Sequence, residues 1–170
     1  METEFRSWAE ESRPRLRISA FMLTSDWYLA DDLVQETLTR LFVVWPRVAK
    51  TGRPDAYARR VLINKFLDSR RRSWRAEIPQ ETLPELQADD PYVDPRRDAV
   101  VAALRDVPDG QRAVLVLRFW DDLSVEQTAQ VLGCSTGNVK SQTSRGLDAL
   151  RRALADRGID QTFRQEVAEP

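Results

Sequence analysis

Residues Ser124 to Leu154, SVEQTAQVLGCSTGNVKSQTSRGLDALRRAL, predict two helices joined by a tight turn. Ser124 is a suitable helix N-cap, and Gln127 three residues later completes a capping box. Gly133 follows the first helix, where a left-handed C-cap favours glycine. Ser135 can cap the second helix. The apolar positions recur at helical spacing, and they are Val125, Ala129, Leu132, Val139, Leu147, Leu150 and Leu154. This pattern is typical of a helix-turn-helix.

The first three turns of the second helix carry polar and basic side chains, away from Val139 and Leu147. In a helix-turn-helix this part enters the major groove of DNA. Lys and Arg bind phosphate or guanine, Gln and Asn pair with adenine, and Ser can do either. An amphipathic helix with a merely solvated polar face has the same pattern. We predict duplex DNA binding, with candidate residues Thr136, Asn138, Lys140, Ser141, Gln142 and Arg145.

The composition excludes several classes of protein. The 170 residues suffice for one domain or two small ones, and a net charge of −1 means that nucleic-acid affinity must come from local patches. The chain has no His and only Cys134, which excludes an intrachain disulfide and a Cys/His zinc site. We expect no metal and no cofactor. The chain lacks a carboxylate cluster, a nucleophile–base pair and a phosphate-binding glycine loop, so we expect no enzyme activity.

The sequence shows neither a membrane-spanning segment nor a secretion signal. No run approaches the roughly 18 apolar residues of a membrane span. The N-terminus carries Glu2 and Glu4 and lacks a basic-then-apolar signal. Strand-like alternation is nearly absent. We therefore expect an all-α protein of the reduced cytoplasm.

Two helices are predicted before residue 50. The first covers 4–24, and we expect Pro14 to divide it. The second covers about 27–48, and either Ser25 or Asp26 can cap it. Its apolar stripe lies opposite the polar side chains of Asp31, Asp32, Gln35, Glu36 and Thr39. This face is either a solvated surface or a docking surface for a basic or polar protein partner.

A third helix is predicted from Pro54 to Trp74, with Pro54 near its first position. It is strongly basic and has aromatic residues interleaved with the charge. This combination is typical of proteins that bind single-stranded DNA, because basic side chains contact its phosphates and aromatic rings stack on its bases. A basic surface helix with aromatic core residues would have the same composition. The basic residues are Arg59, Arg60, Lys65, Arg70, Arg71, Arg72 and Arg75.

Residues 77–98 are acidic and contain four prolines, a composition typical of an extended linker. We predict two small helical domains at 1–76 and 95–157, joined by the linker 77–94 and followed by a short tail at 158–170. In the C-terminal domain, one helix contains Val100, Val101 and Leu104, and another runs from Gln111 to Trp120. The helix-turn-helix completes a four-helix unit.

The whole chain resembles the extracytoplasmic-function (ECF) sigma factors of bacterial RNA polymerase. Three motifs carry the resemblance: DDLVQETLTRLFVVW at Asp31–Trp45, PDAYARRVLINKFLDSRRR at Pro54–Arg72, and PDGQRAVLVLRFWDDLSVEQTAQVLGCSTGNVKSQTSRGLDALR at Pro108–Arg151. Within the family, the chain is similar to a SigE-like subgroup whose recognition helix also reads VKSQTSR.

The resemblance implies roles for the individual surfaces. Sigma region 2, at 1–76, would bind core polymerase and melt and read the minus-ten element as single strand. Region 4, at 95–157, would read the minus-thirty-five element as duplex. The implied polymerase contacts, on the clamp helices of the largest subunit, are Asp31, Asp32, Gln35 and Glu36. The implied minus-ten contacts are Tyr57, Arg59, Arg60, Asn64 and Arg71.

The resemblance also implies partners. These are core RNA polymerase, promoter DNA and an anti-sigma factor, with no membrane. The acidic linker would lie toward the RNA path and mimic its charge. Many family members have Arg where Gln142 stands and a bulkier residue where Ser144 stands, so the promoter sequence does not follow. Trp is common in the family where Tyr57 stands. Two other classes fit parts of the chain: a helix-turn-helix regulator of duplex DNA that is not a polymerase subunit, and a polymerase-binding adaptor.

Overall fold

The computed structural model describes residues 1–76 and 95–159, and these residues form helices and turns without a strand. This confirms the all-α prediction. The linker 77–94 and residues 160–170 of the predicted tail lie outside the described residues. The elements are α1 (Glu2–Thr24), α2 (Trp27–Val48), the short 3₁₀ helix η1 (Ala49–Thr51), α3 (Pro54–Ala76), α4 (Pro95–Leu104), α5 (Asp109–Leu115), the π-helical segment η2 (Val116–Trp120), α6 (Val125–Leu132) and α7 (Thr136–Asp156).

Helix α1 is continuous through Pro14, so the predicted division there is wrong. A proline removes one helical hydrogen bond, which tertiary packing can outweigh. Here the turns before Pro14 are held by an aromatic cluster, in which the Phe5 ring lies 5.2 Å from the rings of both Phe42 and Trp45. Beyond Pro14, Leu16 and Ala20 are buried in the core, so packing on both sides of the proline keeps α1 as one helix.

The connection between α1 and α2 is set by two adjacent residues. Ser25 adopts a left-handed conformation with φ 54°, and its amide donates to the Phe21 carbonyl at 2.7 Å. The Asp26 carboxylate accepts from the amides of Tyr28 and Leu29 at 2.7 and 3.1 Å. Asp26, of the two candidates, is thus the N-cap of α2.

The predicted helix 111–120 is not regular. It is α-helical in α5 and widens into the π-helical η2, where the Asp121 amide donates to the Val116 carbonyl at 2.9 Å. Arg118 donates to the Leu123 carbonyl and so holds the chain after the widened turn. The spacing of apolar residues did not predict this π-helical turn. Such a turn adds one residue to the helix, which barely alters the apolar pattern.

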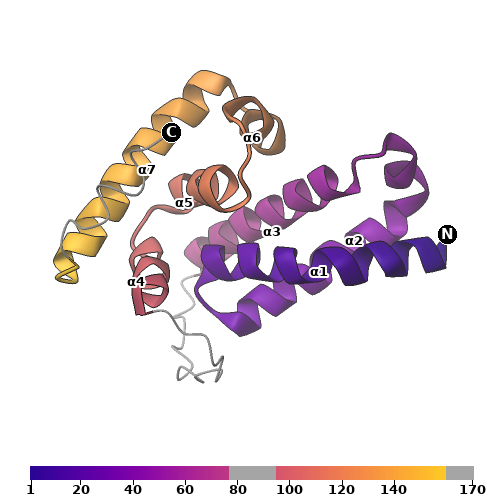
Figure 1. Ribbon diagram of the computed structural model, residues 1–170, viewed down its shortest axis with the longest axis horizontal. Coiled ribbons are helices and arrows are strands. Elements are labelled where there is room, and N and C mark those ends of the chain that lie inside the picture. Colours follow the sequence, from indigo (N-terminus) through magenta and orange to yellow (C-terminus); the bar gives the residue numbers. More distant parts are fainter. Residues whose placement is uncertain (77–94, 160–170) are drawn as a thin grey trace.

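The two groups of helices pack on each other (Figure 1). We call residues 1–76 the N-terminal half and residues 95–159 the C-terminal half. Helices α1 and α3 contact α5, and α3 also contacts α6. One apolar cluster contains Leu23 and Phe66 from the first half and Val107, Leu117 and Val131 from the second. The halves therefore share a core. A smaller cluster of Val114, Ala129 and Val139 belongs to the C-terminal half alone.

Candidate nucleic-acid interface

The caps predicted for the helix-turn-helix are present. The Gln127 amide donates to Ser124 Oγ at 3.0 Å, and the Ser124 amide donates to Gln127 Oε1 at 2.8 Å, which completes the capping box. Gly133 ends α6 with φ 66°. Ser135 Oγ then accepts from the Asn138 amide at 3.1 Å and caps α7. Local hydrogen bonds thus determine where both helices begin and how sharply the chain turns.

The position of α7 depends on Gly146, which the sequence reasoning missed. Gly146 is buried against α5, and a Cβ atom there would lie 3.1 Å from Leu115 Cγ and 3.3 Å from Gln111 Cβ. Contacts that short are tighter than ordinary packing allows. A glycine in the middle of a polar helix, spaced seven residues from the buried Val139, was the available indication.

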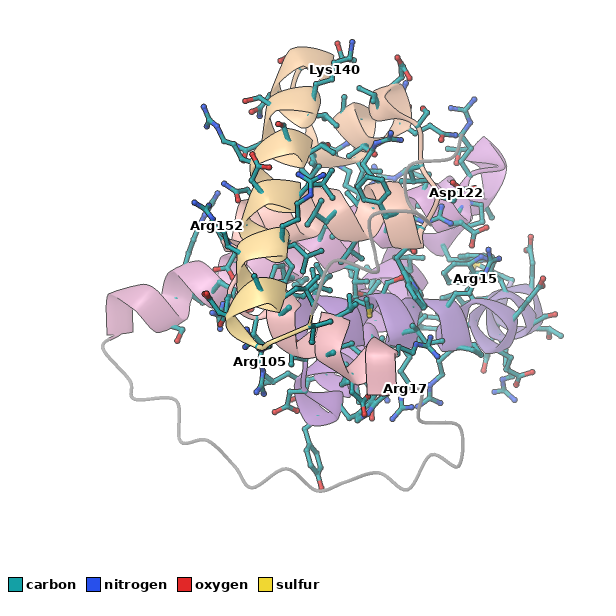
Figure 2. The ribbon with its side chains drawn as sticks, turned by 60° about the vertical axis from the view of Figure 1, so that its left-hand side comes forward. Arg15, Arg17, Arg105, Asp122, Lys140 and Arg152 are labelled. Carbon is teal, nitrogen blue, oxygen red and sulfur yellow. The ribbon has the colours of Figure 1, made fainter. Side chains whose placement is uncertain are left out.

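The candidate duplex-binding residues lie on the outer face of α7. All are exposed except Gln142, which is half-buried. Figure 2 shows Lys140 at the end of α7 that lies beside α6, pointing away from the rest of the molecule, with Arg152 further along the helix. Among the residues that the structure describes, Thr136, Asn138 and Lys140 leave the N-terminal turns of α7 exposed.

Helix α3 brings three of the five candidate minus-ten residues onto one exposed face. These are Arg60, Asn64 and Arg71, spaced four and seven residues apart along the helix. Tyr57 is half-buried and packs against the shared core. Arg71 also lies 4.0 Å from Asp68 in an exposed ion pair. The exposed face of α3 therefore combines two guanidinium groups with an amide.

Arg59, the fifth candidate on α3, faces the C-terminal half. Its Nε atom lies 3.8 Å from Asp121 Oδ2, and the two side chains are only 22% and 12% exposed. Ser19 Oγ of α1 donates to Asp121 Oδ1 at 2.7 Å. Burial raises the pKa of the Asp121 carboxyl, while the Ser19 hydrogen bond and the Arg59 charge act in the opposite direction.

The four candidate polymerase-binding residues on α2 do not form a uniform free surface. Asp32 and Gln35 are exposed. Asp31 instead accepts two hydrogen bonds from Arg17 of α1, at 2.6 and 3.2 Å, and this contact lowers the pKa of the Asp31 carboxyl. Glu36 lies 2.8 Å from Lys65 Nζ of α3. Two of the four side chains are thus engaged within the chain.

Large apolar side chains flank this acidic surface, and the sequence reasoning did not single them out. Tyr28 and Leu29 at the start of α2 are 59% and 43% exposed, and Phe42 and Val43 further along are 49% and 69% exposed. Exposed apolar side chains beside polar ones are typical of protein–protein interfaces.

The structure gives no geometry for a metal. Within 1–76 and 95–159, no three His, Cys, Asp or Glu side chains lie together in a manner suited to an ion. Across the same residues, no helix is long and apolar enough to cross a membrane.

Comparisons with known proteins agree with this arrangement. A family model described as Sigma-70 region 2 matches residues 8–76, and one described as Sigma-70, region 4 matches residues 97–150. The chain is 38% identical over 164 residues to the RNA polymerase sigma-E factor of Streptomyces avermitilis, covering 92% of this chain and 88% of the relative. It is 32% identical over 142 residues to the ECF RNA polymerase sigma factor ShbA of Streptomyces griseus, covering 76% and 73%.

Solved structures include a similar fold. The sigma factor RpoE from Bartonella quintana, crystallised in complex with the anti-sigma factor NepR, matches with a TM-score of 0.73 at 25% identity. The match covers 89% of this chain and 97% of that one. Two family models that together span most of the chain, and relatives that align over most of their length, lead to one conclusion: the chain belongs to the ECF sigma factors, which act with RNA polymerase in transcription initiation.

Proposed function

We propose that this chain binds core RNA polymerase and directs it to promoters, reading the minus-thirty-five element as duplex through α7 and the minus-ten element as single strand through α3. The observation that carries the proposal is the presence of both surfaces in one chain: a capped helix-turn-helix with an exposed polar end, and a basic helix with an exposed amide. A regulator of duplex DNA would need only the first.

Duplex reading rests on the exposed turns of α7. Lys140 and Arg145 supply positive charge for phosphates or guanine, and Gln142 is the candidate for adenine. Asn138 and Ser141 lie on the same exposed stretch. These contacts position the C-terminal half on the promoter without any chemical step.

Single-strand reading rests on α3. Arg60 and Arg71 hold the strand backbone, and Asn64 between them contacts an unstacked base through its amide. Unstacking costs a few kcal/mol per base. The contacts of α3 with the opened strand offset part of this cost. Arg59 joins them once it is free of Asp121.

Polymerase binding rests on α2. Asp32 and Gln35 supply polar contacts, and the exposed rings and aliphatic side chains of Tyr28, Phe42 and Val43 supply apolar area. The partner is the clamp-helix region of the largest subunit. An anti-sigma factor that covers these surfaces is the proposed inhibitor, since the similar RpoE was crystallised with an anti-sigma factor. Such a chain would act in the cytoplasm.

In vitro transcription with purified core polymerase tests the proposal. We expect specific starts on a mixed promoter library only when the chain is added, and enriched upstream sequences at two positions. The Lys140→Ala/Arg145→Ala variant should bind core polymerase but lose the upstream element, whereas Arg151→Ala should initiate as the wild type does. Chain-independent starts, or no binding to core polymerase, would refute the assignment.

A further inference from the structure

The segment that connects α2 to α3 has no fully buried side chain. Val48 at the end of α2 and Ala58 in the second turn of α3 are buried, whereas every residue at 49–57 is exposed or half-buried. This segment contains η1, Gly52 with φ 63° and the first turn of α3. Because apolar burial does not hold this segment, polar contacts have to determine where α3 begins.

Asp55 in the first turn of α3 makes such contacts. Its Oδ1 atom accepts from Trp8 Nε1 at 3.0 Å and from Ser12 Oγ at 3.1 Å, and both donors lie on α1. Ser12 is only 6% exposed, so its hydroxyl needs a partner within the protein. Trp8 also packs on the Trp45 ring of α2, with 5.2 Å between the ring centres. Asp55 thus connects the first turn of α3 to α1 and, through Trp8, to α2.

The turn before Asp55 is closed by short-range hydrogen bonds. Thr51 Oγ1 donates to the Val48 carbonyl at 2.7 Å, and the Gly52 amide donates to the Ala49 carbonyl at 3.1 Å. The Arg53 amide donates to Thr51 Oγ1 at 3.3 Å. All of these partners lie within 48–53, so they determine the shape of the turn. They do not determine its distance from α1, which the Asp55 hydrogen bonds do.

Candidate strand contacts follow Asp55 closely along α3. Tyr57 lies two residues further, and Arg60 lies on the exposed face in the next turn. Side chains that bind a ligand have to be held within roughly 0.5 Å of their productive positions. If the first turn of α3 were not held, the apparent affinity for a strand would fall in proportion to the fraction of chains in the binding geometry.

We propose that Asp55 is a positioning residue for single-strand reading. Its hydrogen bonds to Trp8 and Ser12 hold the first turns of α3, and with them Tyr57 and Arg60, where the opened strand contacts them. Asp55 acts through α3 and not by contact with the strand, because its carboxylate would repel phosphate. The proposal rests on the proposed function, which assigns α3 to the minus-ten element.

The test compares substitutions of Asp55 that remove the same charge. In Asp55→Asn one carbonyl oxygen can still accept both hydrogen bonds, because Trp8 and Ser12 share Oδ1. Asp55→Leu can accept neither. The full chain is added to core polymerase, and specific starts on the mixed promoter library are counted. We expect Asp55→Asn to match or exceed the wild type. Asp55→Leu should bind core polymerase normally but give about a third of the wild-type starts or fewer.

Two further variants control for the loss of a carboxylate and for misfolding. Asp98→Leu is the matched control, because Asp98 is an exposed carboxylate in the first turn of α4, which carries none of the candidate binding residues. It should start as the wild type does. Ser12→Ala removes one of the two donors, so it should lose fewer starts than Asp55→Leu. Combined with Asp55→Leu it should lower the starts no further, since both changes remove the same interaction.

Equal starts from Asp55→Asn and Asp55→Leu would overturn the proposal, because the charge and not the hydrogen bonds would then matter. An equal loss in Asp98→Leu would overturn it as well. So would weaker binding of Asp55→Leu to core polymerase, which would indicate a general loss of the fold. Failure of the proposed function looks different, since the wild-type chain would then give no specific starts with core polymerase.

Discussion

At the scale of single residues, the environment of a side chain decides its role more than its type does. Asp31 and Asp32 are adjacent carboxylates on α2, and both were candidates for the same contact. Asp32 is exposed, whereas Asp31 is held by Arg17, whose guanidinium lies 4.2 Å from the centre of the Trp27 ring. The Trp27 ring in turn stacks on Phe21 at 3.9 Å. This assembly makes Asp31 a link between α1 and α2.

The pH dependence of stability should reflect this link. Arg17 holds the pKa of Asp31 below its value in the unfolded chain, so the pair stabilises the fold above the unfolded pKa and loses its effect as pH falls through the folded pKa. Because the pair is nearly half exposed, Asp31→Asn should cost no more than about 1 kcal/mol at neutral pH. Chemical denaturation at several pH values should show this difference vanishing in acid. A destabilisation by Asp31→Asn that stays the same at every pH would contradict the assignment.

A second prediction at this scale concerns Gly146. In Gly146→Ala the new methyl group meets Leu115, so the free energy of unfolding should fall by about 1–2 kcal/mol and α7 should shift. Gly137→Ala is the control, since its Cβ meets only Ser135 Oγ at 3.8 Å. It should be neutral or slightly stabilising, because alanine favours helix over glycine. Thermal denaturation and duplex binding measure both effects, and equal losses in the two variants would refute the packing argument.

At the scale of the elements, helix ends were predictable and helix interruptions were not. Ser124, Gln127 and Gly133 determine α6 through hydrogen bonds and backbone conformation within a few residues, so sequence alone indicates them. Pro14 and η2 depend on contacts with distant helices. Propensity argues for a break at Pro14, and the aromatic cluster between α1 and α2 prevents it.

The two ends of α7 should contribute differently to DNA binding. Lys140→Ala should reduce the dependence of log affinity on log salt concentration by about one unit, because one phosphate contact is lost. Arg151 lies in the C-terminal part of α7 and pairs with Asp148 at 2.9 Å, so Arg151→Ala should leave the slope unchanged. Duplex binding at several salt concentrations measures the slope. A larger effect from Arg151 would mean that the other end of α7 lies on the DNA.

At the scale of the whole molecule, the two halves share one apolar core although an acidic linker separates them in sequence. Val131 of α6 belongs to the shared core, whereas Val139 of α7 belongs to the small cluster within the C-terminal half. Both are valines and both are buried. They therefore allow the coupling between the halves to be measured with one kind of substitution.

Each Val→Ala change should cost about 2 kcal/mol. Val131→Ala should lower amide hydrogen-exchange protection in α1 and α3 as well as in α6, because it weakens the shared core. Val139→Ala should lower protection mainly in α6 and α7. If Val131→Ala leaves α1 and α3 as protected as in the wild type, the halves do not unfold together.

The helix-turn-helix, the basic helix and the acidic face of α2 could be derived from the order of residues, because caps and helical periodicity act over a few residues. The sequence also identified the candidate residues on α3 and α7. It did not indicate that Arg59 meets Asp121, or that Arg112 donates to the Leu23 carbonyl, since these partners are 62 and 89 residues apart. Such pairs form only when the shared core brings the two halves together, so tertiary packing alone decides which of the candidate side chains are free.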